Sequence, residues 1–184
     1  LGLQVHLGQF HGIEIDEWSA SIARVAMFLA DHQANLALEQ ITGSAPNRFP
    51  LTESASIVTG NALQVDWAES CPMNSKTFIL GNPPFNGARW QSQQQKEDTA
   101  RVWNGIRGAG EMDFVANWFL IAGKLAAESK CKVGFVSTNS IAQGEQASIL
   151  WSQLLPLKLE IDFAHRSFTW SNGAPGQAAV TVVI

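Results

Sequence analysis

Short apolar runs alternate with longer segments of helical periodicity along this sequence of 184 residues. The apolar runs predict strands at residues 9–15, 56–60, 76–81, 132–138, 157–164 and 178–184. Helical spacing predicts helices from about residue 17 to 40 and at residues 112–128 and 143–155. The last two strands are expected to form an antiparallel pair. This alternation is typical of an α/β fold, in which helices cover both faces of a mostly parallel sheet.

The first predicted helix has a start signal and an apolar stripe. Asp16 is expected to cap the helix that begins at Glu17, because its side chain can accept a hydrogen bond from the first turn. The stripe has the pattern of a helix that packs on a core, and it consists of Ile22, Val25, Ala26, Leu29, Gln33 and Leu36.

Two polar segments separate the predicted elements. Residues 42–54 are rich in Ser, Thr, Pro and Gly and are expected to form a loop. Residues 86–110 contain glutamines, glycines and four spaced cations, and a long mobile loop is expected there. The cations are expected to be solvated, with phosphate contact as the alternative; they are Arg89, Lys96, Arg101 and Arg107.

The most informative chemistry follows the strand predicted at residues 76–81. That strand ends on Gly81, and the next residues are Asn82, Pro83, Pro84 and Phe85. Ligands bind at the carboxyl ends of strands in open α/β sheets. Proline fixes φ and restricts the residue before it, so the carbonyl of Pro83 is held in one direction.

This arrangement could bind a planar heterocyclic amine. The amine would donate one hydrogen to the Asn82 side-chain oxygen and the other to the Pro83 carbonyl, while its ring stacks on Phe85. Two acceptors arranged in this way localise the nitrogen lone pair, which makes the amine a better nucleophile in the transition state. A simple strand-to-loop turn is the alternative, since Asn-Pro and Pro-Pro are common in turns.

Composition limits the class of protein. The apolar fraction of 46% and the charged fraction of 15% indicate one globular domain rather than a disordered chain. No apolar stretch reaches the length of a membrane span, so no membrane partner is expected. Cys71 and Cys131 fit no metal spacing and are expected to be reduced, which favours a cytoplasmic location. A net charge of −4 argues against a strong independent hold on nucleic acid.

Five stretches in order resemble the amino-group methyltransferases that act on DNA adenine with S-adenosylmethionine. They are Gly12-Ile13-Glu14-Ile15-Asp16, Gly60-Asn61-Ala62-Leu63, Asn82-Pro83-Pro84-Phe85, Phe135-Val136-Ser137-Thr138-Asn139-Ser140 and Phe163-Ala164-His165-Arg166-Ser167-Phe168. The similarity extends from Phe10 to Ile184. It is greatest to the methyltransferase domain of large single-chain restriction-modification and phage-defence enzymes.

The resemblance implies a Rossmann-like fold, S-adenosylmethionine as cofactor, DNA as substrate, and a role for each matching residue. Glu14 would bind the cofactor ribose and Ile15 would pack on its adenine. Asn61 stands where the family usually has an aspartate that binds the adenine amino group, and the adjacent Ala62 would also belong to the cofactor site. Phe168 matches the aromatic residue that stacks on the target base, which leaves the duplex to reach the active site. No metal is implied.

The family normally has a first strand and a glycine-rich turn that hold the methionine part of the cofactor. No such strand and turn precede Phe10, so residues 1–184 are expected to be an excerpt of a longer enzyme, and this excerpt alone is expected to bind cofactor weakly or not at all. Either another part of the enzyme supplies the missing strand, or the fold rearranges to close the gap. Other parts of the enzyme are expected to provide most of the DNA contact.

Three other functions stay open. Methyltransferases that act on RNA or on protein glutamine share the Asn-Pro-Pro core but usually have Tyr at the fourth position, where this sequence has Phe85. A non-catalytic assembly subunit is the second alternative. The third alternative is a nicotinamide-dependent oxidoreductase, which would also use Glu14. That function does not explain the sequence of residues 82–85.

Overall fold

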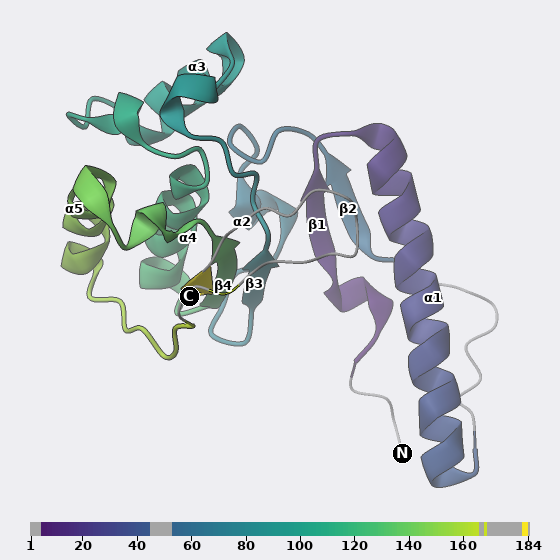
Figure 1. Cartoon of the computed structure of the whole chain (residues 1–184). Helices are drawn as coiled ribbons and strands as arrows, with labels where there is room; N and C mark the ends of the chain where they lie inside the picture. The colour runs from purple at the N-terminus through teal and green to yellow at the C-terminus, as the bar shows by residue number, and fades with distance from the viewer. Residues whose placement is uncertain (1–4, 45–52, 166–167, 169–181, 184) are drawn as a thin grey trace. The chain divides into compact units, whose positions relative to one another are not determined.

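The computed structural model describes residues 5–44, 53–165, 168, 182 and 183 (Figure 1). The chain divides into two compact units, Leu1–Cys71 and Pro72–Ile184, and each is described by itself. The described strands form two separate sheets, β1-β2 in the first unit and β3-β4-β5 in the second. The fold is therefore mixed α/β, as predicted.

The first unit is a parallel strand pair covered by one long helix. Its elements are η1 (Leu7–Gln9), β1 (His11–Glu14), α1 (Glu17–Thr42), β2 (Ser56–Thr59) and α2 (Trp67–Ser70). Glu14 lies opposite Thr59 in the parallel register, so the carboxyl ends of β1 and β2 coincide. The predictions of both strands and of the long helix are confirmed.

The ends of α1 follow from local chemistry, but its buried face differs from the predicted one. Oδ1 of Asp16 accepts the Ser19 N–H at 2.8 Å, and the helix ends at Gly43, whose φ of 71° suits glycine. Ala20 is fully buried, and the Arg24 guanidinium donates to the Ile57 carbonyl at 2.7 Å.

The predicted stripe of α1 is exposed, so this expectation is wrong for the described structure. The exposed members of the stripe are Ile22, Val25, Ala26, Leu29, Gln33 and Leu36. The face that contains Ala20 and Arg24 packs on β2 instead, and the Arg24 guanidinium bonds to the strand backbone.

The second unit contains the larger sheet. Its strands are β3 (Phe78–Gly81), β4 (Lys132–Ser137) and β5 (Val182–Val183), and β4 pairs parallel with β3 and antiparallel with β5. Its helices are α3 (Gln93–Trp103), α4 (Ala116–Ser129) and α5 (Gly144–Leu154). Short 3-10 turns are η2 (Ala88–Trp90), η3 (Ala109–Glu111), η4 (Asn139–Ile141) and η5 (Leu155–Leu157).

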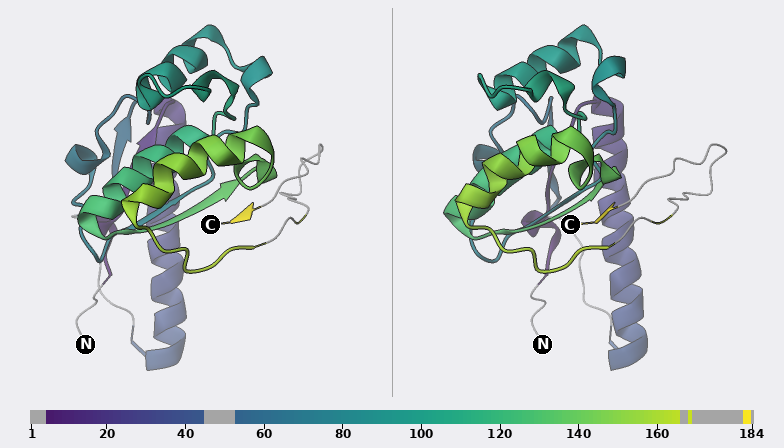
Figure 2. Two further views of the ribbon diagram at one scale, coloured as in Figure 1. Left: turned by 90° about the vertical axis from the view of Figure 1, so that its left-hand side faces the viewer. Right: turned by 60° about the vertical axis from the view of Figure 1, so that its left-hand side comes forward.

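Helix α4 connects the layers of the second unit. Figure 2 shows α4 and α5 side by side, with β4 beside α4. The rings of Phe119 on α4 and Phe135 on β4 meet edge to face, with centroids 5.3 Å apart. On the other side, the α3 side chain Trp103 is buried against α4.

Two predictions for the second unit are wrong. Residues 86–110 contain α3 instead of forming a long loop, because Ser92 and Gln95 form a capping box that starts a helix in a polar sequence. Residues 158–165 contain no strand, since Lys158 turns the chain with a φ of 55° after η5.

The end of the chain is also paired differently from the prediction. Val182 and Val183 pair with β4 rather than with residues 157–164. The remaining residues of the predicted strand 178–184 lie outside the described part.

Candidate active site

The Asn82–Phe85 segment begins where β3 ends, as the sequence predicts. Gly81 lies opposite Phe135 on β4, and a Cβ added to Gly81 would be 3.3 Å from the Phe135 ring. Pro83 is buried, whereas Asn82 and Pro84 are exposed. Within residues 53–165, the Asn82 side chain has no hydrogen-bond partner. Its amide is therefore available to a ligand.

Asn86 fixes the chain immediately after Phe85. Its backbone carbonyl accepts hydrogen bonds from Phe114 N–H at 2.9 Å and from the Gln91 side chain at 3.2 Å. Its side-chain Nδ2 donates to Gln95 Oε1 at 2.9 Å and to the Trp90 carbonyl at 3.2 Å. The Asn82–Phe85 segment thus leads into a bonded turn.

Asp113 joins this turn to the end of β4. The carboxylate is 7% exposed, and its Oδ1 accepts the Asn86 N–H at 3.1 Å and the Val115 N–H at 3.3 Å. Its Oδ2 accepts the Thr138 hydroxyl at 3.1 Å, and that hydroxyl also bonds to Ser140. The backbone N–H of Asp113 donates to Gln146 Oε1 at 2.7 Å. Thr138 therefore supports the loop after β4 through these bonds.

The network contains residues that the sequence did not single out: Asp113, Asn86, Gln91, Gln95 and Gln146. Ser92-x-x-Gln95 is a recognisable capping box and could have revealed α3. Asp113 has no comparable signal, because its partners Asn86 and Thr138 lie 27 and 25 residues away in the sequence.

The first unit brings Glu14 and Asn61 to one edge of its sheet. The Gly60 N–H donates to the Glu14 carbonyl at 2.8 Å, which holds the end of β2 beside the end of β1. The Glu14 carboxylate is half-buried and accepts the Asp16 N–H at 3.2 Å. Ile15 is 71% exposed.

The turn after Asn61 is internally bonded. Oδ1 of Asn61 accepts the Leu63 N–H at 2.9 Å, and the Ala62 carbonyl accepts the indole N–H of buried Trp67 at 2.8 Å. Trp67 is thus a packing residue. Asp66 caps α2 by accepting the Ala68 N–H at 2.8 Å.

The predicted site residues fall into separate groups. Glu14, Ile15, Asn61 and Ala62 belong to the first unit, and Asn82, Pro83, Pro84 and Phe85 to the second. Phe168 also belongs to the second unit, where its side chain is 44% exposed. Its immediate neighbours lie outside the described residues, so its stacking role stays a prediction.

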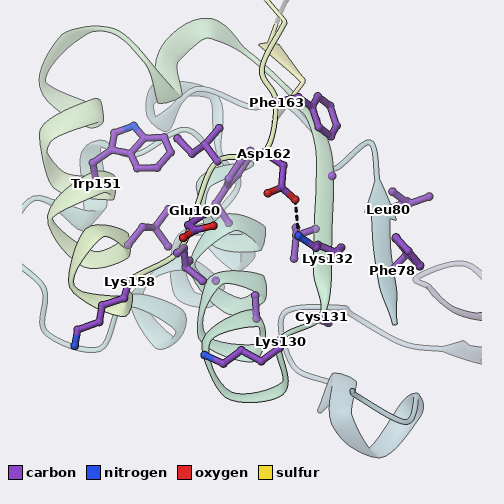
Figure 3. Close-up of a pocket in the computed structure, with 18 residues that line it drawn as sticks. Phe78, Leu80, Lys130, Cys131, Lys132, Trp151, Lys158, Glu160, Asp162 and Phe163 are labelled. Atoms are coloured by element: carbon purple, nitrogen blue, oxygen red, sulfur yellow. Dashed lines mark hydrogen bonds and ion pairs between the residues drawn. The ribbon is translucent and has the colours of Figure 1, made fainter. Parts of the chain in front are cut away.

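A cleft of about 600 Å³ in the second unit is lined by none of these residues. It lies between β4, the helices α4 and α5, and the segment 158–163 (Figure 3). The Lys132 ammonium and the Asp162 carboxylate pair across it at 2.6 Å, and this hydrogen bond raises the pKa of Lys132. The cleft is mainly apolar.

Among the residues that the structure describes, no group of three or more His, Cys, Asp or Glu side chains could hold a metal ion. No helix in that part of the chain is long and apolar enough to cross a membrane.

Comparisons with known proteins agree on one family. The family model described as MmeI, DNA-methyltransferase domain, matches residues 1–184. DNA methyltransferase A of Bacillus subtilis (strain 168) is 37% identical over 183 residues, which are 98% of this chain and 21% of that protein.

A solved structure of the Type IIL restriction-modification enzyme MmeI in complex with DNA is also similar. It has a TM-score of 0.87 and 44% identity, over 98% of this chain and 24% of that one. The chain thus spans about a fifth to a quarter of the length of these relatives. These similarities confirm the resemblance seen in the sequence, and the chain belongs to the MmeI family of DNA-methyltransferase domains.

Proposed function

We propose that the protein transfers a methyl group from S-adenosylmethionine to N6 of adenine in DNA, as part of a restriction-modification or phage-defence system. The observation that carries this proposal is the exposed, unpartnered Asn82 amide at the end of β3. The names of the relatives support DNA methylation, and the MmeI structure was solved with DNA.

The chain's own residues would activate and orient the amine. Asn82 Oδ1 and the Pro83 carbonyl accept one N6 hydrogen each and favour a pyramidal nitrogen, which develops only in the transition state. Phe85 and Phe168 stack on the two faces of the extruded base. With the cofactor bound, the N6 lone pair held by these residues would accept the methyl group from the sulfonium, which would keep the electron pair, and the extra proton would leave to water.

Residues of the first unit fit the nucleoside part of the cofactor. When bound, S-adenosylmethionine supplies an electrophilic methyl group on a sulfonium. The half-buried Glu14 carboxylate at the end of β1 is suited to two ribose hydroxyls. The bonded turn of Asn61 and Ala62 at the end of β2 presents an edge for the adenine, and Ile15 offers an exposed apolar surface.

We also assign the chain to the Rossmann-like class of methyltransferase folds. The support is two parallel strand pairs, each with candidate ligand-binding residues at its carboxyl end. Other parts of the full-length protein would supply target recognition and most of the DNA contact, since this chain carries a net charge of −4.

The test is methyl transfer by the full-length protein. Labelled S-adenosylmethionine is incubated with genomic duplex DNA, and the digested nucleosides are separated. Label in N6-methyl-2′-deoxyadenosine, abolished by Asn82→Ala, is expected. Label in cytosine alone would refute the adenine assignment. Absence of transfer despite bound cofactor and DNA would favour an assembly subunit.

A further inference from the structure

We propose that Asp113 is a positioning residue for the catalytic segment Asn82–Phe85. This inference rests on the proposed function, because positioning matters only if that segment binds the reacting amine. Asp113 itself would not touch the substrate. It acts through Asn86, which directly follows Phe85.

One carboxylate connects three parts of the second unit. Oδ1 of Asp113 bonds to the Asn86 N–H after the catalytic segment and to the Val115 N–H at the start of α4. Oδ2 bonds to the Thr138 hydroxyl directly after β4. A buried carboxylate is stable only when such donors surround it, so the three segments are held together as a set.

The chain between Asn86, which Asp113 contacts, and the proposed amine acceptors at Asn82 and Pro83 is short and stiff. The Asn86 N–H belongs to the peptide unit that follows Phe85, and two prolines with fixed φ precede Phe85. A shift of Asn86 is therefore transmitted toward the Pro83 carbonyl and Asn82. Misplacement of a catalytic group by about 1 Å can lower a rate about 100-fold.

A purely structural role for Asp113 makes a different prediction. Its Oδ1 bond to Val115 N–H also supports the start of α4, so its loss would lower stability in either case. In a structural role, the rate per folded molecule would stay the same. In a positioning role, the chemical step slows in molecules that remain folded and saturated with ligands.

The experiment measures single-turnover methyl transfer by the full-length protein at saturating cofactor and a duplex with the recognised site. Asp113→Ala is expected to lower this rate about 100-fold. The dissociation constants of DNA and cofactor are expected to change less than about threefold, since Asp113 touches neither. In Asp113→Asn, the amide oxygen still accepts from Asn86 and Val115 and the amide NH₂ donates to Thr138, so most of the rate should return.

The matched control is Asp98→Asn. Asp98 is also a buried acid of the second unit, 1% exposed, and its partners include Arg101 and Gln94, whereas the bonds of Asn86 do not include Asp98. Its single-turnover rate per folded molecule should equal that of the wild type. An equal fall in Asp98→Asn, or an unchanged rate in Asp113→Ala, would overturn the inference.

A second variant, Thr138→Val, tests the inference if Asp113→Ala does not fold. Thr138→Val removes only the hydroxyl that bonds to Oδ2, and it should lower the single-turnover rate about tenfold with unchanged affinities. An unchanged rate in that variant would then overturn the inference. If the wild type transfers no methyl group at all, the proposed function fails instead, and the two failures are distinguishable.

Discussion

The indole N–H of Trp103 donates to Oδ1 of Asn117 at 2.8 Å, and both side chains are almost completely buried. Nδ2 of Asn117 donates in turn to the Thr99 hydroxyl at 3.0 Å and to the Phe114 carbonyl at 2.8 Å. This amide therefore joins α3 to the start of α4. These hydrogen bonds explain how the polar helix α3 packs within a compact unit, because the buried polar atoms of Trp103 and Thr99 both have a partner in Asn117.

Asn117→Leu is expected to lower the free energy of unfolding by about 2–4 kcal/mol, because it leaves the Trp103 N–H and the Thr99 hydroxyl buried without that partner. Urea unfolding followed by tryptophan fluorescence measures the change. Gln93→Ala is the control, since Gln93 bonds only to the exposed side chain of Glu97. That variant should lose less than about 0.5 kcal/mol. A similar loss in both variants would contradict the role of Asn117.

Local patterns predicted much of the fold. The strands β1, β3 and β4 follow from apolar runs, and α1 begins at Asp16 because the cap is a contact between near neighbours in the sequence. The position of the Asn82–Phe85 segment directly after β3 was predicted for the same reason. These features depend on sequence separations of only a few residues.

The errors concern contacts between distant residues. Helix α3 is polar, and its packing depends on Asn117 on α4, so apolar periodicity did not reveal it. The buried face of α1 is decided by Arg24 bonding to Ile57, which apolar periodicity does not anticipate. Asp113 was missed because its role exists only when residues 86 and 138 are brought together.

Gly108→Ala is expected to destabilise the second unit by about 1–3 kcal/mol, because it combines backbone strain with overpacking. Gly108 has a φ of 87°, and an added Cβ would lie 2.7 Å from Cδ1 of Ile149 on α5. Thermal unfolding measures the loss. Gly110→Ala should be nearly neutral, because an added Cβ there meets nothing within 4 Å. Equal effects at the two glycines would argue against this packing.

The cap at Asp16 predicts a pH dependence of the first unit. The Ser19 N–H hydrogen bond lowers the pKa of Asp16 below its ordinary value of 3.8. The resulting stabilisation is present above that ordinary value and is lost as the pH falls through the lower pKa of the folded state. Asp16→Asn keeps a cap but cannot titrate, so its unfolding midpoint should fall less than that of the wild type below about pH 4. Urea titrations at several pH values test this, and parallel curves would contradict it.

Glu14→Ala is expected to weaken cofactor binding by the full-length protein about 10- to 100-fold, because it removes a charged acceptor for the ribose hydroxyls. Calorimetry with S-adenosylmethionine measures the dissociation constant. Glu17→Ala is the matched control, since Glu17 is an exposed acid in the first turn of α1, three residues farther along the chain. The affinity for DNA should not change in either variant. An equal loss of cofactor affinity in both would indicate a general charge effect, whereas a loss confined to Glu14→Ala identifies the end of β1 as the ribose site.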